Sequence, residues 1–191
     1  VSGASRFGKI IVYSEILVLS IFVAFGLIAF FQKPDLSVSL SNSFKPLFPL
    51  GIFGLLSAMG LMYIGFEGSE IIVQSGEELK NPKKNIPRAI LLSLGIVCLL
   101  YFLIIFAALA GVSANLPSWE ILSEAGQGAL VKASGFFMPG MEWIMIFGGI
   151  LAASAALNAT IFSSSHVSFS MGRSGTLPKF LAKIHPKNHT P

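Results

Sequence analysis

Residues 64–70 read IGFEGSE and interrupt residues 47–73, a run that otherwise has the composition of a membrane-spanning helix. Two glycines and two carboxylates stand there, although the lipid interior penalises both a broken helix and a charge. A helix broken at this depth is stable only inside protein or beside a water-filled cavity, where its exposed ends attract a zwitterionic or ionic ligand. We therefore predict a binding site at this break. Its residues are Ile64, Gly65, Phe66, Glu67 and Gly68.

Each residue type in the break has a physical role. Gly65 and Gly68 permit the backbone to leave the helical conformation, Phe66 can form a wall, and Glu67 supplies an ionisable group. In the alternative interpretation, the glycines are sites of close helix packing and Glu67 faces a neighbouring helix. The binding site is the favoured interpretation, because carboxylates inside a membrane usually mark functional pathways.

The composition points to a membrane protein. Hydrophobic residues make up 53% of the 191 residues and charged residues only 12%, about half of the charged fraction of soluble domains. Four stretches approach or exceed the roughly 20 residues that cross a bilayer. They are residues 10–31, 47–73, 87–112 and 141–170. The predicted fold is all-α, integral to the membrane, with a single transmembrane domain over residues 1–191.

The positive charges follow the topology that these spans imply. Ten of the thirteen Lys and Arg residues precede the first span, follow the second or follow the fourth. The positive-inside rule then places the N-terminus, the 74–88 loop and the C-terminus in the cytoplasm of a multi-pass protein of the cell membrane. Cytoplasmic loops are expected at 74–86 and 171–191. An external helix is expected at about 118–132, capped by Ser118, where it lies along the membrane surface or plugs an external vestibule.

Two further groups of polar residues lie within the spans. Glu15 is about 9 Å along the helix from Lys9, so a proton-carrying role and an interfacial position are both open. In the fourth span, small residues at every fourth position predict close helix packing. The polar residues Asn158, Ser163 and Ser164 could also line a pathway or coordinate Na⁺.

Other classes of function lack their signatures. The chain has no nucleophile–base pairing, phosphate loop or cluster of metal ligands, so we expect neither an enzyme nor a metal site. Cys98 is the only cysteine. Nucleic-acid binding is not expected, since no basic patch is interleaved with aromatic residues.

The segment YIGFEGSEIIVQSGEELKNPKKNIPRAI, residues 63–90, closely resembles the amino acid–polyamine–organocation permeases. A Gly-Phe-acid break in their sixth helix is followed by a cytoplasmic motif. The matching residues here are Glu77, Glu78, Lys80, Asn81, Pro82, Pro87 and Arg88. The tail from residue 158 onward likewise resembles the end of the eighth helix and the loop after it, so the resemblance covers essentially the whole chain.

The resemblance implies helices five to eight of about twelve, in an inverted-repeat fold with a broken first and sixth helix. It implies an amino acid or amine substrate held by both broken helices, with the lipid bilayer and the remaining helices of a longer transporter as partners. Some proton-coupled relatives carry a lysine midway along helix five, near the place of Glu15. The coupling ion is therefore open: H⁺ on Glu15 or Glu67, Na⁺ near Ser163 and Ser164, or none. No cofactor is implied.

The leading hypothesis is a secondary active transporter of amino acids or related amines that works by alternating access, proton-coupled or as an exchanger, with Glu67 in proton-linked gating. The chain is then an incomplete core. A non-transporting receptor or sensor of the same fold, or a truncated structural remnant, are the alternatives. Directed flux into sealed vesicles distinguishes transport from both.

Overall fold

Helices form all the regular secondary structure in the part of the chain that the computed structural model describes, residues 2–74, 81–113 and 116–184. Three helices are long and apolar enough to cross a membrane. They are α1 (Ser2–Phe31), α5 (Pro82–Gly111) and α8 (Glu142–Ser174). The predicted all-α membrane fold is confirmed.

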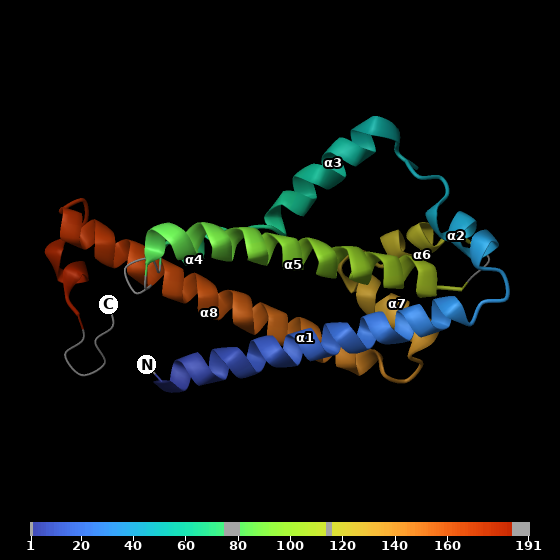
Figure 1. Ribbon diagram of the computed structural model, residues 1–191, viewed down its shortest axis with the longest axis horizontal. Coiled ribbons are helices and arrows are strands. Elements are labelled where there is room, and N and C mark those ends of the chain that lie inside the picture. Colours follow the sequence, from blue (N-terminus) through green and yellow to red (C-terminus); the bar gives the residue numbers. More distant parts are fainter. Residues whose placement is uncertain (1, 75–80, 114–115, 185–191) are drawn as a thin grey trace.

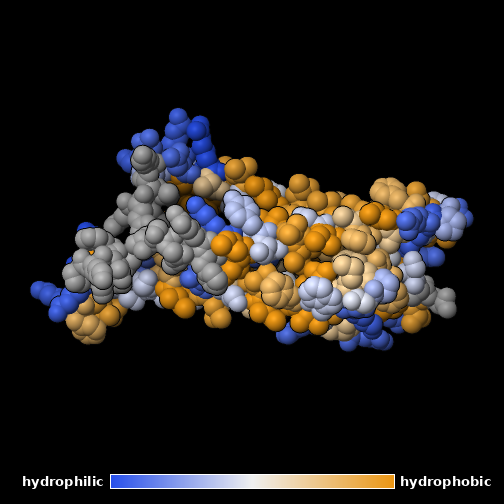
Figure 2. Space-filling view, turned by 90° about the horizontal axis from the view of Figure 1, so that it is seen from below, coloured by the Kyte–Doolittle hydropathy of each residue, from blue (hydrophilic) through white to orange (hydrophobic). Residues whose placement is uncertain are grey.

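The three long helices lie side by side, with α1 in contact with both α5 and α8 (Figure 1). α1 and α5 run in the same direction and α8 runs in the opposite one. We call the end of the bundle that holds Phe31 and Gly111 the Phe31 end, and the other the Pro82 end. Figure 2 shows apolar residues over the middle of one face and hydrophilic residues mainly toward the two ends, the pattern expected of a membrane-embedded bundle.

Small residues let the long helices approach closely. A Cβ atom built on Gly26 of α1 would lie 2.8 Å from the Cβ atom and 3.0 Å from the carbonyl oxygen of Ala107 in α5. About two turns earlier on α1, a methyl carbon of Val18 would lie 2.7 Å from a Cβ atom built on Gly148 of α8. Glycine at these two crossings is the means of close packing that membrane helices commonly use.

The second predicted span is two helices, α3 (Gly51–Ile64) and α4 (Ser69–Gln74). The 14 residues of α3 extend about 21 Å, less than the roughly 30 Å of a hydrocarbon core. α3 leaves the bundle (Figure 1) and has no buried residue, and the side chain of Phe53 is 80% exposed. A helix that is apolar on all sides needs lipid or further protein around it.

Two helix boundaries differ from the expected ones. α5 begins at Pro82, five residues earlier than expected, so Pro87 lies inside the helix instead of in its first turn. The physical reason is that Pro82 itself takes the first helical position, where a missing N–H has no cost. α8 continues to Ser174 and ends at Gly175, which has φ +80°.

The helix expected at 118–132 is a pair of helices. α6 (Ser118–Glu124) and α7 (Ala129–Phe137) are joined by the short 3₁₀ helix η2 (Gly126–Gly128). Gly126, with φ +51°, ends the first helix because it adopts a left-handed conformation. Pro117 occupies the cap position that was expected for Ser118, and no side chain caps α6. Two shorter elements are α2 (Leu36–Phe44) and η3 (Lys179–Ala182).

The α6–α7 hairpin is part of the core. The buried cluster takes side chains from α1, α5 and α8, and also Ile121, Leu122 and Ala133 from the hairpin. The rings of Phe22 in α1 and Phe137 in α7 meet edge to face, 5.1 Å apart. The hairpin is therefore packed into the bundle by its buried side, and its placement relative to the membrane stays a prediction.

Lys33 connects the segment after α1 to the end of α5, at the Phe31 end of the bundle. Its ammonium group donates hydrogen bonds of 2.8 Å to the carbonyl oxygens of both Ala110 and Val112, at the end of α5. A cation at a helix C-terminus is favourable because the last carbonyl groups carry partial negative charge. Burial lowers the pKa of Lys33 below its ordinary value.

Lys33→Met should destabilise this end of the bundle. It removes the donor from two carbonyl groups, at a cost of about 1–3 kcal/mol for buried acceptors left unpaired. Thermal unfolding of the purified protein in detergent measures the effect. Lys45→Met, at an exposed lysine between α2 and α3, is the control. Equal unfolding temperatures for the two variants would contradict the role of Lys33.

Candidate functional site

The backbone turns sharply between α3 and α4. The amide groups of Gly65, Phe66 and Glu67 donate to carbonyl groups three residues earlier, at 3.0, 3.0 and 3.2 Å. This tight turn replaces the four-residue spacing of the α-helix. Gly68 follows with φ +119°, a conformation that other residues rarely adopt. The break that the sequence predicts at residues 65–68 is therefore present, and its backbone is held by local hydrogen bonds.

Tyr101 of α5 supports this turn from the side. Its hydroxyl group donates a 2.7 Å hydrogen bond to the carbonyl oxygen of Gly65. Its ring also meets the ring of Phe66 edge to face, 5.5 Å away. A Cβ atom on Gly65 would lie 3.1 Å from the hydroxyl oxygen, so glycine leaves the space for this contact.

A hollow of about 180 Å³ lies between the break and α5. Gly65, Phe66, Glu67 and Gly68 line it from the break, and Ser93 is the polar residue from α5. The side chain of Glu67 is exposed in this chain, and that of Phe66 is half-buried. Four of the five predicted site residues thus surround one hollow, and Ile64 ends the helix that leads into it.

Tyr101→Phe removes the hydroxyl group that holds the break and keeps the aromatic ring. We expect a lower unfolding temperature, because the Gly65 carbonyl group loses a partner worth about 0.5–1.5 kcal/mol. Thermal unfolding in detergent checks this. Tyr63→Phe is a matched control, since Tyr63 lies on α3 and is 73% exposed. A similar loss in both variants would count against the role of Tyr101.

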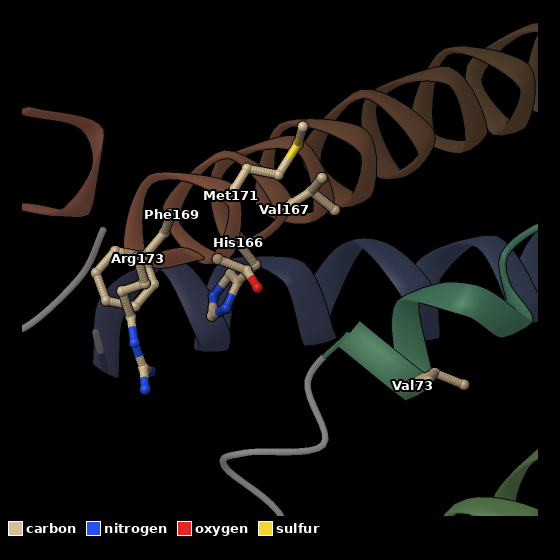
Figure 3. A pocket seen from close by; sticks show the side chains of 7 residues that line it. Val73, His166, Val167, Phe169, Met171 and Arg173 are labelled. Atoms are coloured by element: carbon tan, nitrogen blue, oxygen red, sulfur yellow. The ribbon is translucent and has the colours of Figure 1, made fainter. Parts of the chain in front are cut away.

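A second hollow, of about 310 Å³, lies between α4 and the last turns of α8 (Figure 3). Figure 3 shows the side chains of His166 and Arg173 directed to the same side of α8. The ring of His166 is 4.2 Å from that of Phe162, and the guanidinium group of Arg173 is 5.8 Å from the ring centre of Phe169. α4 therefore has a hollow on the α5 side and another on the α8 side.

The predicted ion-coupling residues are spread along the bundle. Glu15 lines a hollow with Ala152 of α8, whereas Ser163 is eleven residues farther along α8, or about 16 Å. Asn158 lies near Gly8 at the Pro82 end: a Cβ atom on that glycine would be 3.7 Å from the Asn158 amide nitrogen. Ser164 is exposed. The structure thus does not gather Glu15 and the two serines into one site.

Part of the predicted cytoplasmic motif lies outside the described residues, namely Glu77, Glu78 and Lys80. The rest begins α5. Asn81 precedes the helix with φ +51°, Pro82 is its first residue, and Pro87 and Arg88 lie in its second turn.

Three candidate residues, Tyr101, His166 and Arg173, were not predicted from the sequence. Tyr101 is the only tyrosine in the apolar α5, and a hydroxyl group there needs a partner. His166 and Arg173 are seven residues apart, which places them on one face of a helix. Both signals are visible in the sequence, but the partner of Tyr101 is 36 residues away and could not be read from it.

The family model for amino acid permeases matches residues 1–191, the whole chain. The chain belongs to the amino acid permease family. The resemblance in the break and in the motif after it is thereby confirmed at the level of the family. The family match and the three long apolar helices both support a multi-pass membrane protein.

Three relatives illustrate the range of the permease family. The chain is 29% identical to the branched-chain amino acid permease BcaP of Bacillus subtilis, over 100% of this chain and 38% of that protein. It is 26% identical to the methylthioribose transporter of Bacillus subtilis, again over 100% and 38%. It is 31% identical to the Asc-type amino acid transporter 1 of Mus musculus, over 100% and 35%. No solved structure matches the chain.

The permease chain spans less than two fifths of the length of these relatives. α3 is an all-apolar helix with no buried residue, the kind of surface that further helices or lipid cover. Among the described residues, the hollow at the break is lined by the break itself, by Ile72 of α4 and by α5.

Proposed function

We propose that this chain forms the central part of a secondary transporter that moves amino acids or related small molecules across the cell membrane by alternating access. The break at residues 65–68 carries the proposal, since it places a carboxylate and a turned backbone beside a hollow within a membrane protein. The names of the relatives support amino acids first, and the methylthioribose transporter widens the class of substrate.

In this proposal, the Pro82 end of the bundle faces the cytoplasm. The support is the distribution of Lys and Arg: of the eleven that the structure describes, eight lie toward that end. The α6–α7 hairpin then faces outward and closes the outer part of the bundle. The remaining helices of a longer transporter complete the substrate site.

A proton on Glu67 is the proposed coupling ion. Glu67 lines the hollow at the break, so a change in its charge acts directly on a bound substrate and on the turn between α3 and α4. Glu15 is the second carboxylate of this kind and borders a separate hollow. Sodium near Ser163 and Ser164 is less well supported, because Ser164 is exposed and the two residues lie apart from Glu15.

Uptake into sealed proteoliposomes tests the proposal. The natural protein that carries this sequence is reconstituted, and the entry of radiolabelled amino acids and of methylthioribose is measured with and without a pH gradient. Transport predicts saturable entry of at least one of them. Binding without any flux would overturn the proposal and favour a receptor or sensor of the same fold.

A further inference from the structure

A third hollow, of about 340 Å³, lies between α1, the α6–α7 hairpin and α8. Its volume is at the lower end of the range for cavities that bind small molecules. The small residues Gly149 and Ala152 of α8 leave this space open opposite α1. A Cβ atom on Gly149 would meet no atom within 4 Å.

The hollow is apolar except at two places. Aliphatic side chains such as Val18 and Leu130 form most of its wall. Glu15 of α1 and Gln127 at the tip of the hairpin are its long polar side chains. A carboxylate with an apolar cavity beside it, in the middle of a spanning helix, needs a cation or a proton nearby, because an unpaired charge there is costly.

We propose that this hollow binds a small hydrophobic amine, with its ammonium group on the Glu15 carboxylate and its apolar body against the aliphatic wall. A proton alone would satisfy the charge of Glu15 but would leave the space unused. An amine with an apolar body fits both the charge and the cavity. Gln127 supplies an amide oxygen that can accept a second hydrogen bond from the ammonium group.

This amine site is separate from the break. The residues that line the two hollows have no member in common, and they come from different elements. Gln127 instead connects the amine site to the hairpin. Val18, which also lines this hollow, lies about 20 Å along α1 from Phe31. A bound amine therefore bridges the tip of the hairpin and α1, which gives the site a means to restrain the hairpin.

Binding of phenethylamine to the purified protein in lipid nanodiscs tests the proposal, with empty nanodiscs as the blank. Calorimetry should show saturable binding to the wild type. Glu15→Gln should weaken it roughly tenfold or more, because a hydrogen-bonded charge is lost. 2-Phenylethanol, which has the same shape without the charge, should bind as weakly to the wild type as phenethylamine binds to Glu15→Gln.

Gly149→Leu is the second variant, since its side chain occupies the open space and should abolish binding. Gly95→Leu in α5 is the matched control, because a Cβ atom there also meets nothing within 4 Å and Gly95 does not line the hollow. Unchanged binding of phenethylamine to Glu15→Gln would overturn the proposal. Loss of binding in Glu67→Gln but not in Glu15→Gln would also overturn it, because the amine would then bind at the break. Glu15→Gln decides the question even if Gly149→Leu does not fold. Neither result depends on flux, so the proposed transport is tested independently.

Discussion

Glu67→Gln should lower the accumulation of substrate by about tenfold for each pH unit of gradient across the membrane. A coupled proton supplies about 1.4 kcal/mol per pH unit, and an amide cannot carry it. The exposed position of Glu67 beside the hollow at the break makes it accessible to both proton and substrate. The ratio of internal to external substrate in proteoliposomes, with and without an imposed pH gradient, measures the effect.

Glu15→Gln is the matched control for this prediction. It removes the other carboxylate within a spanning segment but leaves the break intact. If Glu67 carries the proton, Glu15→Gln should retain most of the response to the pH gradient. An unchanged response in Glu67→Gln, or a response lost only in Glu15→Gln, would remove Glu67 from the coupling mechanism.

Gly26→Val is expected to prevent α1 and α5 from packing. Its Cβ atom alone would approach the Ala107 carbonyl oxygen to 3.0 Å, and Val adds two methyl groups beyond it. Ala107 is fully buried, so neither helix can yield locally. Overpacking in a core costs about 1–3 kcal/mol, and a clash with backbone belongs at the upper end or above it. The yield of folded protein after detergent extraction and its unfolding temperature should both fall strongly.

Gly95→Val controls for the effect of a β-branched residue in a spanning helix. A Cβ atom at Gly95 meets nothing within 4 Å, so this variant changes helix propensity without a clash. It should fold at nearly the yield of the wild type. If Gly26→Val were equally well tolerated, the close crossing of α1 and α5 would not be required for folding.

The break at residues 65–68 could be predicted because its signal is local. Glycines and a carboxylate inside an apolar run conflict with an uninterrupted spanning helix, and the structure resolves this conflict with a turn. The long helices α1 and α8 were predictable for the same reason, since length and hydropathy depend only on neighbours in sequence.

The contacts that position the site are not local. The hydrogen bond from Tyr101 to Gly65 joins two helices, and the burial of Ile121 and Leu122 depends on where the α6–α7 hairpin meets α1 and α5. The composition of the hairpin suits a membrane surface as well as a plug, so the sequence alone does not separate the two. The early start of α5 depends on whether Pro82 or Pro87 takes the first helical position.

If the break lies in the path of the substrate, a bound substrate should protect a cysteine placed in the break from labelling. Phe66→Cys is placed in a background with Cys98→Ser, because Cys98 is exposed. Phe53→Cys, on the part of α3 away from the break, is the control. We predict that a transported substrate slows labelling at position 66 and leaves position 53 unchanged. Equal labelling at position 66 with and without substrate would contradict the account.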